Sequence, residues 1–317
     1  MRRIVVGFVV ALATTGALAQ VDFPTKPIRI IVPYAPGGTD QQIRTLAPSL
    51  QKILGQTLVI ENREGGGASI GANAVKMAVP DGYTLLYTGT GAFTVVPHIR
   101  KGVPYTLDDF VPIGNVTGTS FIVAARADAP FKTYAEFIAF ARANPGKVNF
   151  GSAGLGTTTH MTGEVLQGAA GVQFTHVPFQ GIGPAVRALI GSQIDIAIGL
   201  PSAIMPQVNG GKAVALASSG AVRSEFAPSA PTMREAGTDA VEITKFGLFA
   251  PKGVPEPVLA RLTSALAEAV KSPDFTELAK KTFNTIYYLN PADYRKALDD
   301  ESRYFRKLIT DLKLSEQ

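Results

Sequence analysis

The sequence lacks cysteine and tryptophan altogether and has three histidines among its 317 residues. Without cysteine, disulfides, thiolate metal ligands and cysteine nucleophiles are all excluded. The fold must therefore rest on its apolar core, and a chain of this length with 46% hydrophobic residues can bury enough surface for that. No histidine stands in an H-E-x-x-H pattern and no carboxylates cluster at metal-ligand spacing, so we expect no bound metal.

The sequence also has only a small excess of charge of one sign. The formal net charge is +5, and the sequence has no basic stripe with interleaved aromatic residues and no helix-turn-helix or zinc-finger spacing. We therefore expect no nucleic-acid partner. A complete G-x-G-x-x-G motif and a P-loop lysine are missing too, which argues against a nucleotide cofactor, and we expect no cofactor of any kind.

One apolar run, at the N-terminus, approaches the length of a membrane span. Arg2 and Arg3 precede an apolar stretch from Ile4 to Ala13, and Ala17-Leu18-Ala19 follows. This order is typical of a secretory signal peptide, predicted here as residues 1–19. A membrane anchor, the alternative, needs roughly 20 apolar residues, and this run is interrupted after about ten. We expect a periplasmic protein whose mature chain of roughly 300 residues forms about two domains.

Strand-length apolar runs alternate with segments of helical period along the mature chain. The first strand is expected at Pro27 to Val32, and the apolar residues from Ile43 to Leu54 fall on one face of a helix. The same alternation restarts near Phe121, whereas two amphipathic helices, Pro257 to Val270 and Asp293 to Leu312, close the chain. The pattern predicts an α/β fold with two similar domains, in which the C-terminal segment completes the first domain.

Three junctions share one form, in which a strand ends, a Gly/Pro-rich turn follows and a helix begins. They are Pro33 to Asp40, Gly151 to Thr159 and Pro178 to Pro184. Each would direct unpaired backbone N–H groups outward from a helix N-terminus, where the macrodipole favours an anion. Ordinary turn and capping chemistry explains one such junction equally well. Three of them, with hydroxyls at Thr39 and Thr157, keep an anion site open as the second interpretation.

One catalytic motif stands out, Gly67-Ala68-Ser69-Ile70-Gly71, which matches G-x-S-x-G. A nucleophile elbow requires a strand that ends just before the serine, and here a glycine run precedes it. An exported serine hydrolase that uses Ser69 is the alternative to a binding protein, and we favour the binding protein, which is not an enzyme. A third hypothesis, the effector-sensing domain of a regulator, conflicts with the signal peptide.

Two side chains near the junctions have alternative roles. Arg44 lies four residues after Asp40 on the first helix, a spacing that permits a local ion pair, which we favour, or a bidentate contact with a second ligand carboxylate. His160 lies near the start of the helix after the second junction, where we favour packing or capping over orienting a group in the cleft. The residues alone decide neither role.

In chain order, these motifs resemble the tripartite tricarboxylate transporter receptors, also called the Bug family of periplasmic binding proteins. The matching segments span essentially the whole mature chain: PIRIIVPYAPGGTD with Arg44, VIENREGGGASIGA, PDGYTLL, GSAGLGTTTHMTGE, HVPFQGIGPAVRALIGSQIDIAIG, GLFAPKGVPEPV and the closing PADY and DDESRYF. Two positions depart from the family pattern. Only Thr39 separates the glycine pair from Asp40, and Glu64 stands where the family usually has proline.

The resemblance implies a type II periplasmic-binding fold, in which two α/β domains joined by a hinge enclose an interdomain ligand cleft. The first domain would comprise residues 20–123 and 246–317, and the second residues 124–245. The implied function is an extracytoplasmic solute-binding protein that captures a small carboxylate by domain closure, partly through ordered waters. Its partners would be the membrane subunits of a tripartite tricarboxylate-type transporter, and we expect the protein itself to be a monomer.

The expected anchor combines the three junction loops. Hydroxyls of Ser152 and Thr157 and the N–H of Gly154 should bond one ligand carboxylate, unless Ser152 is only a cap. The first domain should face the carboxylate with Thr39 and Thr88, and two glycines of the third loop should approach it by backbone. The complete set of predicted ligand-binding residues is Tyr34, Gly38, Thr39, Asp40, Thr88, Gly89, Phe93, Ser152, Ala153, Gly154, Thr157, His160, Phe179, Gly181 and Gly183.

Aromatic residues at or beside these loops bear on the ligand. Tyr34, Phe93, Phe179 and Phe246 could stack on a planar ligand, although core packing explains aromatic residues near loops equally well. We expect an aromatic or dicarboxylic acid. Whether Arg44 or Lys245 contacts the far end of such a ligand stays open.

Overall fold

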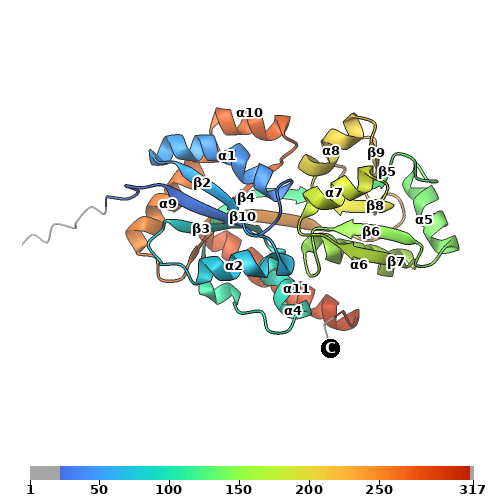
Figure 1. Ribbon diagram of the computed structural model, residues 1–317, viewed down its shortest axis with the longest axis horizontal. Coiled ribbons are helices and arrows are strands. Elements are labelled where there is room, and N and C mark those ends of the chain that lie inside the picture. The colour runs from blue at the N-terminus through green and yellow to red at the C-terminus, as the bar shows by residue number, and fades with distance from the viewer. Residues whose placement is uncertain (1–21, 315–317) are drawn as a thin grey trace, which may run out of the picture.

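The computed structural model describes residues 22–314. The predicted signal peptide and its cleavage site lie outside the described residues. Within the described part of the chain, no helix has the length and apolarity needed to cross a membrane. Figure 1 shows two α/β units side by side, each with helices packed on a twisted sheet. The predicted α/β class with two domains is confirmed.

The first domain is built on a six-stranded sheet with the strand order β11-β4-β10-β3-β1-β2. β1 pairs in parallel with β2 and β3, whereas β10 runs antiparallel to β3 and β4. The last two strands of the chain thus join a sheet begun by its first four. The strands are β1 (Ile28–Val32), β2 (Leu58–Asn62), β3 (Thr84–Gly89), β4 (Phe110–Ser120), β10 (Ile243–Pro251) and β11 (Ile286–Leu289).

Helices cover both faces of this sheet (Figure 1). On one face, α1 packs against α9 and α10, and on the other α2 contacts β1 and β3 while α11 contacts β4. The predicted helices near the two ends of the chain are confirmed as α1, α9 and α11. Helical elements of this domain are α1 (Thr39–Leu54), η1 (Gly66–Ala68), α2 (Ser69–Lys76), α3 (Gly91–Thr94), α4 (Val96–Ile99), η2 (Leu107–Asp109), α9 (Glu256–Ala269), α10 (Pro273–Lys281) and α11 (Pro291–Asp311).

The second domain is built on a five-stranded sheet with the strand order β7-β6-β8-β5-β9. β6 pairs in parallel with β7 and β8, and β5 runs antiparallel to β8 and β9. In Figure 1, α7 and α8 lie above this sheet and α6 below it. Its elements are β5 (Ile122–Arg126), α5 (Tyr134–Ala143), β6 (Val148–Ser152), α6 (Thr158–Ala170), β7 (Phe174–Pro178), α7 (Ile182–Ile190), β8 (Ile196–Gly199), α8 (Pro201–Asn209) and β9 (Ala213–Ser218).

The buried strands explain how the fold is held without disulfides. β1 reads Ile-Arg-Ile-Ile-Val, and every residue in it except Arg29 is at most 1% exposed. Such near-continuous apolar runs are typical of parallel strands covered on both faces. The helix α1 buries Ile43, Leu46 and Leu50 against this sheet. Burying one such aliphatic side chain contributes about 1.5–3 kcal/mol, so the core accounts for the stability of the scaffold.

Two chain segments cross between the domains side by side and are tied together by Ser219. The Ser219 hydroxyl accepts a hydrogen bond from the Phe121 N–H at 2.9 Å and donates one to the Glu242 carbonyl at 2.6 Å. β5 begins at Ile122 and β10 at Ile243, so both crossings lie within a few residues of the predicted boundaries at 123/124 and 245/246. The boundaries themselves stay a prediction.

A second hydrophobic cluster joins the domains away from these crossings. Phe305 and Ile309 on α11 pack with Val95 and Ile99 of the first domain and with Met161 on α6 of the second. The C-terminal helix therefore belongs to the first domain by its sheet contacts and touches the second domain with its last turns.

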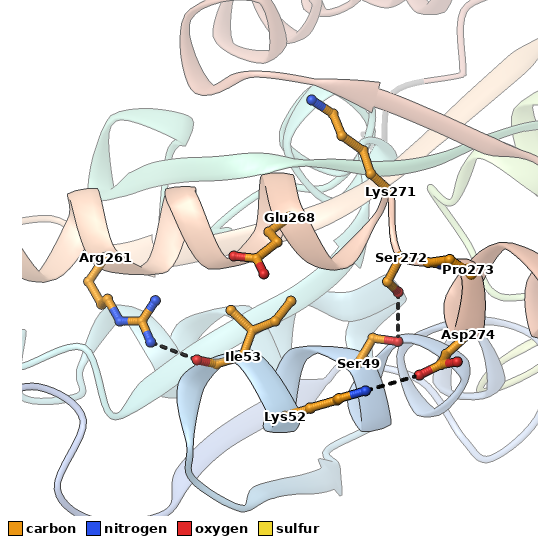
Figure 2. A pocket seen from close by; sticks show the side chains of 9 residues that line it. All are labelled: Ser49, Lys52, Ile53, Arg261, Glu268, Lys271, Ser272, Pro273 and Asp274. Atoms are coloured by element: carbon orange, nitrogen blue, oxygen red, sulfur yellow. Dashed lines mark hydrogen bonds and ion pairs between the residues drawn. The ribbon is translucent and has the colours of Figure 1, made fainter.

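A groove of about 860 Å³ lies on the outer side of the first domain, among α1, α9 and the start of α10 (Figure 2). Its polar groups bind one another: Lys52 pairs with Asp274, the Ser272 hydroxyl donates to that of Ser49, and the Arg261 guanidinium donates to the Ile53 carbonyl at the end of α1. These contacts hold the three helices together, so we assign the groove a structural role.

Candidate functional site

The first and third junction loops meet backbone to backbone across the cleft. The Ala35 N–H donates to the Gln180 carbonyl at 2.6 Å. A methyl group placed on Gly37 would lie 2.7 Å from the Gly183 Cα, and one placed on Gly183 would lie 2.2 Å from the Pro36 carbonyl oxygen. Only glycine permits so close an approach, so these residues set how far the two domains can close.

The second junction loop packs against a different part of the first domain. A methyl group on Gly67 would lie 2.3 Å from the Leu155 carbonyl oxygen, and one on Gly91 would lie 3.0 Å from the Thr158 nitrogen. The Thr158 hydroxyl also lies 3.2 Å from that of Thr244, at the start of β10. All three predicted loops therefore lie at the interface between the domains.

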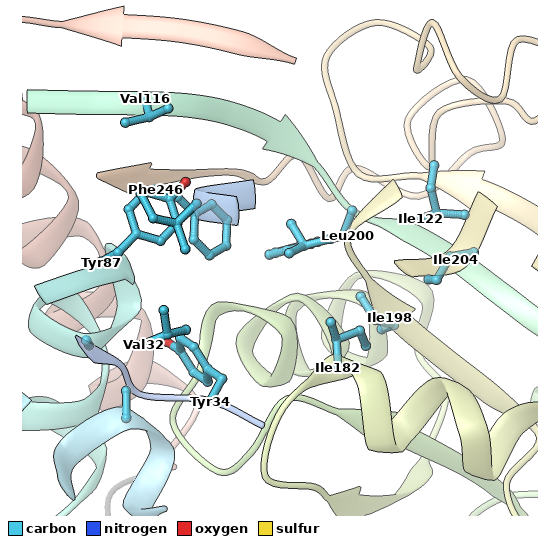
Figure 3. Close-up of a cluster of buried hydrophobic side chains, with 14 of the residues drawn as sticks. Val32, Tyr34, Tyr87, Val116, Ile122, Ile182, Ile198, Leu200, Ile204 and Phe246 are labelled. Atoms are coloured by element: carbon cyan, nitrogen blue, oxygen red, sulfur yellow. The ribbon is translucent and has the colours of Figure 1, made fainter. Parts of the chain in front are cut away.

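A small cavity of about 20 Å³ lies where these loops meet, which is room for one water molecule. Figure 3 shows the apolar side chains around it, with Tyr34 and Phe246 on the side of the first domain and Ile182 and Leu200 on the side of the second. No charged side chain is among its lining residues, which are Tyr34, Thr39, Phe121, Ala153, Thr157, Thr158, Thr159, Ile182, Leu200 and Phe246.

Four helices begin at this cavity. Thr39, Thr158 and Ile182 are the first residues of α1, α6 and α7, and Leu200 is the residue before α8. No side chain caps the N-termini of α1, α7 and α8, whereas the Thr157 hydroxyl caps α6 by accepting the His160 N–H. The positive ends of four helix dipoles thus converge on a site without basic side chains, an arrangement suited to a small anion.

In the second loop, Thr157 and Ala153 line the cavity, whereas Ser152 is fully buried behind it. The Ser152 hydroxyl accepts the Gly154 N–H at 3.1 Å and lies 2.7 Å from Nε2 of His176. The Ser152 hydroxyl and the Gly154 N–H, which were both predicted to bond the ligand, are therefore hydrogen-bonded to each other. Their contact with a ligand stays a prediction.

The first domain contributes the phenol of Tyr34 and the phenyl ring of Phe246 to the cavity. The Tyr34 hydroxyl lies 3.4 Å from that of Thr88, which is fully buried behind it. Burial raises the pKa of Tyr34 to about 12, so the phenol stays neutral and keeps its proton for donation. The Phe246 ring lies on Gly89, where a methyl group would come within 2.8 Å of it. Of these predicted residues, Tyr34 lines the cavity, and Thr88 and Gly89 support it.

Asp40 organises the first loop. Its Oδ1 accepts the Gly37 N–H at 2.6 Å, and its Oδ2 accepts from Nε of Arg44 at 2.8 Å. The favoured ion pair between Asp40 and Arg44 is confirmed. Lys245 likewise pairs with Glu301 at 3.2 Å. Because both cations are paired and neither lines the cavity, neither is placed at the far end of a ligand.

Four of the fifteen predicted residues line the cavity, namely Tyr34, Thr39, Ala153 and Thr157. Among the others, three side chains pack elsewhere. Phe93 packs in an aromatic cluster with Phe110 and Phe249, at ring distances of 5.0 and 4.8 Å, because α3 turns it into the first-domain core. His160 stacks on His176, and Phe179 packs beside Gly151. Gly38, Gly181 and Gly183 bring the loops together instead, since a methyl group on Gly38 would lie 2.3 Å from the Ile182 side chain and one on Gly181 3.1 Å from the Ala35 nitrogen.

Six lining residues were missed by the predicted set: Phe121, Thr158, Thr159, Ile182, Leu200 and Phe246. Leu200 had a signal, because Gly199-Leu200-Pro201 is a fourth junction between a strand and a helix. Thr158 and Thr159 belong to a threonine run already noted. Phe121 has no local signal, because only the crossing of the chain between domains brings it to the cavity.

Ser69 does not form a nucleophile elbow. It starts α2 directly after the 3-10 turn η1, and its hydroxyl donates to the Gly66 carbonyl at 2.8 Å rather than to a histidine. A nucleophilic serine needs a base within hydrogen-bond reach. The geometry therefore does not support the hydrolase alternative at this serine.

Comparison with known proteins gives one consistent result. The family model described as "Tripartite tricarboxylate transporter family receptor" matches residues 42–314. A protein of Cupriavidus necator, described as the UPF0065 protein in the gbd 5' region, is 37% identical over 306 residues, which is 96% of this chain and 93% of that protein.

Two solved structures are similar over almost their full length. The periplasmic binding protein BugD superposes with a TM-score of 0.89 at 31% identity, over 93% of this chain and 100% of that one. MatC from Rhodopseudomonas palustris, described with bound malate, superposes with a TM-score of 0.86 at 29% identity, over 90% of this chain and 100% of that one. The type II periplasmic-binding fold is thereby confirmed. This chain belongs to the tripartite tricarboxylate transporter receptor family, also called the Bug family.

Proposed function

We propose that this chain captures a small carboxylate between its two domains in the periplasm and delivers it to the membrane subunits of a tripartite tricarboxylate-type transporter. The observation that carries this proposal is the convergence of four helix N-termini on one cavity, three of them without a side-chain cap. Uncapped N–H groups and helix dipoles bind an anion without basic side chains. The carboxylate held by the related MatC supports the choice of anion.

Capture requires no chemistry, and we propose that the protein is not an enzyme. Of the two close serine–histidine contacts among the described residues, the one between Ser152 and His176 lies behind the cavity wall, and the one between His98 and Ser302 involves no residue that lines the cavity. Burial and the neighbouring His160 lower the pKa of His176 to about 3, which makes its imidazole a weak general base. Donors directed at an anion are sufficient for a receptor.

The ligand is proposed to be an aromatic or dicarboxylic acid. In the loaded receptor, the apolar side chains of Tyr34, Phe246 and Leu200 would contact the body of such an acid, and the hydroxyls of Thr39 and Thr157 would face its carboxylate. Because no cation lines the cavity, a second carboxylate would bind through hydroxyls, backbone N–H groups or water rather than through an ion pair.

Loading requires the domains to separate. A cavity of about 20 Å³ is too small for an acid of several carbons, so the structure represents a closed arrangement. We propose residues 20–123 with 246–317 and residues 124–245 as the two rigid parts, with the hinge at the Ser219 contacts. Hinge closure is the usual way in which such receptors bury a small solute. We further propose that the signal peptide is cleaved after Ala19 and that the mature receptor is a monomer.

The direct test is a thermal-shift and calorimetry screen of the mature protein with benzoate, adipate, malate and citrate. Benzamide and adipamide are matched neutral controls. A carboxylate that binds should raise the unfolding midpoint by mass action, while the corresponding amide should not. Solution scattering with the tightest binder should report compaction. The proposal fails if no carboxylate binds, or if amides bind as well as acids.

A further inference from the structure

A stack of three rings, two of them buried and that of His176 half-buried, lies behind the second junction loop. The rings of His160 on α6 and His176 on β7 lie 4.2 Å apart and nearly parallel, and the ring of Phe150 on β6 lies 4.6 Å from that of His176. Neither histidine lines the cavity. Receptor function as proposed above needs no stacked histidine pair, so the pair requires its own explanation.

Each imidazole holds one part of the loop. Nε2 of His176 lies 2.7 Å from the Ser152 hydroxyl, at the start of the loop. Nδ1 of His160 accepts the Gly156 N–H at 3.3 Å, near the end of the loop. That contact requires Nδ1 to be unprotonated, so the proton of neutral His160 lies on Nε2, 3.4 Å from the Glu164 carboxylate.

The hydrogen bonds connect His176 to a cavity-lining residue. The Ser152 oxygen accepts the Gly154 N–H at 3.1 Å, so its own proton is free for one acceptor. With His176 neutral and its proton on Nδ1, that acceptor is Nε2. The Gly154 carbonyl meanwhile accepts from the Thr157 hydroxyl at 2.7 Å and from the Thr157 N–H at 3.2 Å. Thr157 in turn lines the cavity and caps α6.

Protonation of His176 would reverse the first bond of this chain. Nε2–H would then donate to the Ser152 oxygen, and the Ser152 proton would turn to the Gly154 carbonyl, 3.3 Å away. That carbonyl already accepts two hydrogen bonds from Thr157, and a carbonyl has two lone pairs. A third donor therefore competes with the contacts that place Thr157.

We propose that His160 and neutral His176 are positioning residues that hold loop 152–157 in the shape that presents Thr157 to the ligand, so that protonation of His176 weakens capture. This inference rests on the proposed function and adds regulation to its site. The titratable groups that face His176 are His160 and, beyond it, Glu164, both on α6, while β6 presents the uncharged Phe150 and Ser152.

The direction of the pH effect on stability follows from the lowered pKa of His176. Burial and His160 lower it from 6.5 to about 3 in the folded protein, so the unfolded chain takes up the proton first as the pH falls. The stability that neutral His176 provides is complete above pH 6.5 and is lost as the pH falls toward 3. Loop order and capture in the folded protein should weaken as the pH approaches 3, where folded His176 takes up its proton.

Two substitutions of His176 separate positioning from simple packing. His176→Phe keeps a stacked ring but removes the acceptor, whereas His176→Gln keeps an acceptor near the position of Nε2 but does not titrate. With malate, benzoate or adipate as the calorimetric probe at pH 7.5, we expect His176→Phe to weaken binding about tenfold and His176→Gln less than about threefold. As the pH falls from 5 toward 3, His176→Gln should also lose less affinity than the parent protein. His98→Gln, a change at the histidine that bonds Ser302 outside the cleft, is the matched control and should alter neither value.

A ligand-free measurement keeps this inference separate from the proposed function. Nitrogen NMR of the imidazoles should show His176 neutral down to pH 5, and hydrogen exchange at the Gly154 and Gly156 amides should accelerate in His176→Phe but not in His176→Gln. Equal exchange or equal affinity in the two variants overturns the positioning role. An unchanged pH profile in His176→Gln overturns the pH role. If no probe binds but exchange behaves as expected, the proposed function fails while the loop assignment stands.

Discussion

The two walls of the cleft differ in how they would recognise a ligand. The second domain contributes three helix N-termini and the threonine run 157–159, whereas the first contributes one helix N-terminus and the rings of Tyr34 and Phe246. Helix dipoles and hydroxyl groups bind a charged group of the ligand, whereas aromatic rings pack against its apolar part. The second domain is thus the side that should hold the carboxylate, and the first the side that should select the body of the ligand upon closure.

The largest effect on ligand affinity is expected from a substitution where the two domain walls are in contact. Gly183→Ala places a methyl group 2.2 Å from the Pro36 carbonyl oxygen, which must hold the domains apart. Overpacking costs about 1–3 kcal/mol, so affinity should fall roughly 5- to 150-fold while the unfolding midpoint of the ligand-free protein changes little. Calorimetry and scattering check this outcome. The control is Gly168→Ala on α6, where the nearest atom is at 3.8 Å, and equal effects of the two changes would contradict the contact.

Removing a hydroxyl from each wall in turn tests whether the second domain, rather than the first, holds the carboxylate. Thr157→Val removes a lining hydroxyl of the second domain, and a hydrogen bond to a charged group contributes about 1.5–3 kcal/mol. Affinity for the tightest carboxylate should therefore fall by about tenfold or more. Thr39→Val on the first-domain wall should cost less. A larger loss for Thr39→Val would reverse the assignment of the anchor.

The proposed hinge lies in neither wall, so a substitution there should change the stability of the protein without changing its ligand selectivity. Burial and the nearby Glu301 raise the pKa of Glu242 well above 4.5. A raised carboxyl pKa gives stability that is present below pH 4.5 and is lost as the pH rises through the folded pKa. Glu242→Gln should therefore raise the unfolding midpoint at pH 8, by about 2–4 °C for each 1 kcal/mol regained, and not at pH 4. A thermal scan at the two pH values decides this, and a lowered midpoint at pH 8 would contradict it.

The smallest effect is expected at the phenol of the first-domain wall. Tyr34→Phe keeps the ring and removes only the hydroxyl, whose contact with Thr88 is long at 3.4 Å. The affinity for benzoate should change less than about threefold, since so long a contact should contribute near the low end of the roughly 0.5–1.5 kcal/mol typical of a neutral hydrogen bond. Competition calorimetry with benzoate and malate is the measurement. A tenfold loss for both ligands would mean that the phenol bonds the carboxylate directly.

Much of the scaffold was predictable because its signals are local. The helical period from Ile43 predicted α1, and the strand-to-helix junctions located the loops that meet at the cavity. The i to i+4 spacing predicted the ion pair between Asp40 and Arg44. Sequence reasoning did less well for side-chain direction. Phe93 follows a loop near the cleft, yet its ring packs into the first-domain core.

By itself, the sequence determined the α/β class, the order of most elements, the three glycine-rich loops and the resemblance to the receptor family. Each of these depends on residues close together in the chain, where periodicity and turn chemistry act. Only the tertiary structure brought Leu200 and Phe121 to the cavity and engaged Ser152 with His176. The physical reason is that a cleft consists of contacts between distant segments, and which side of a loop faces a ligand is set by the packing behind it.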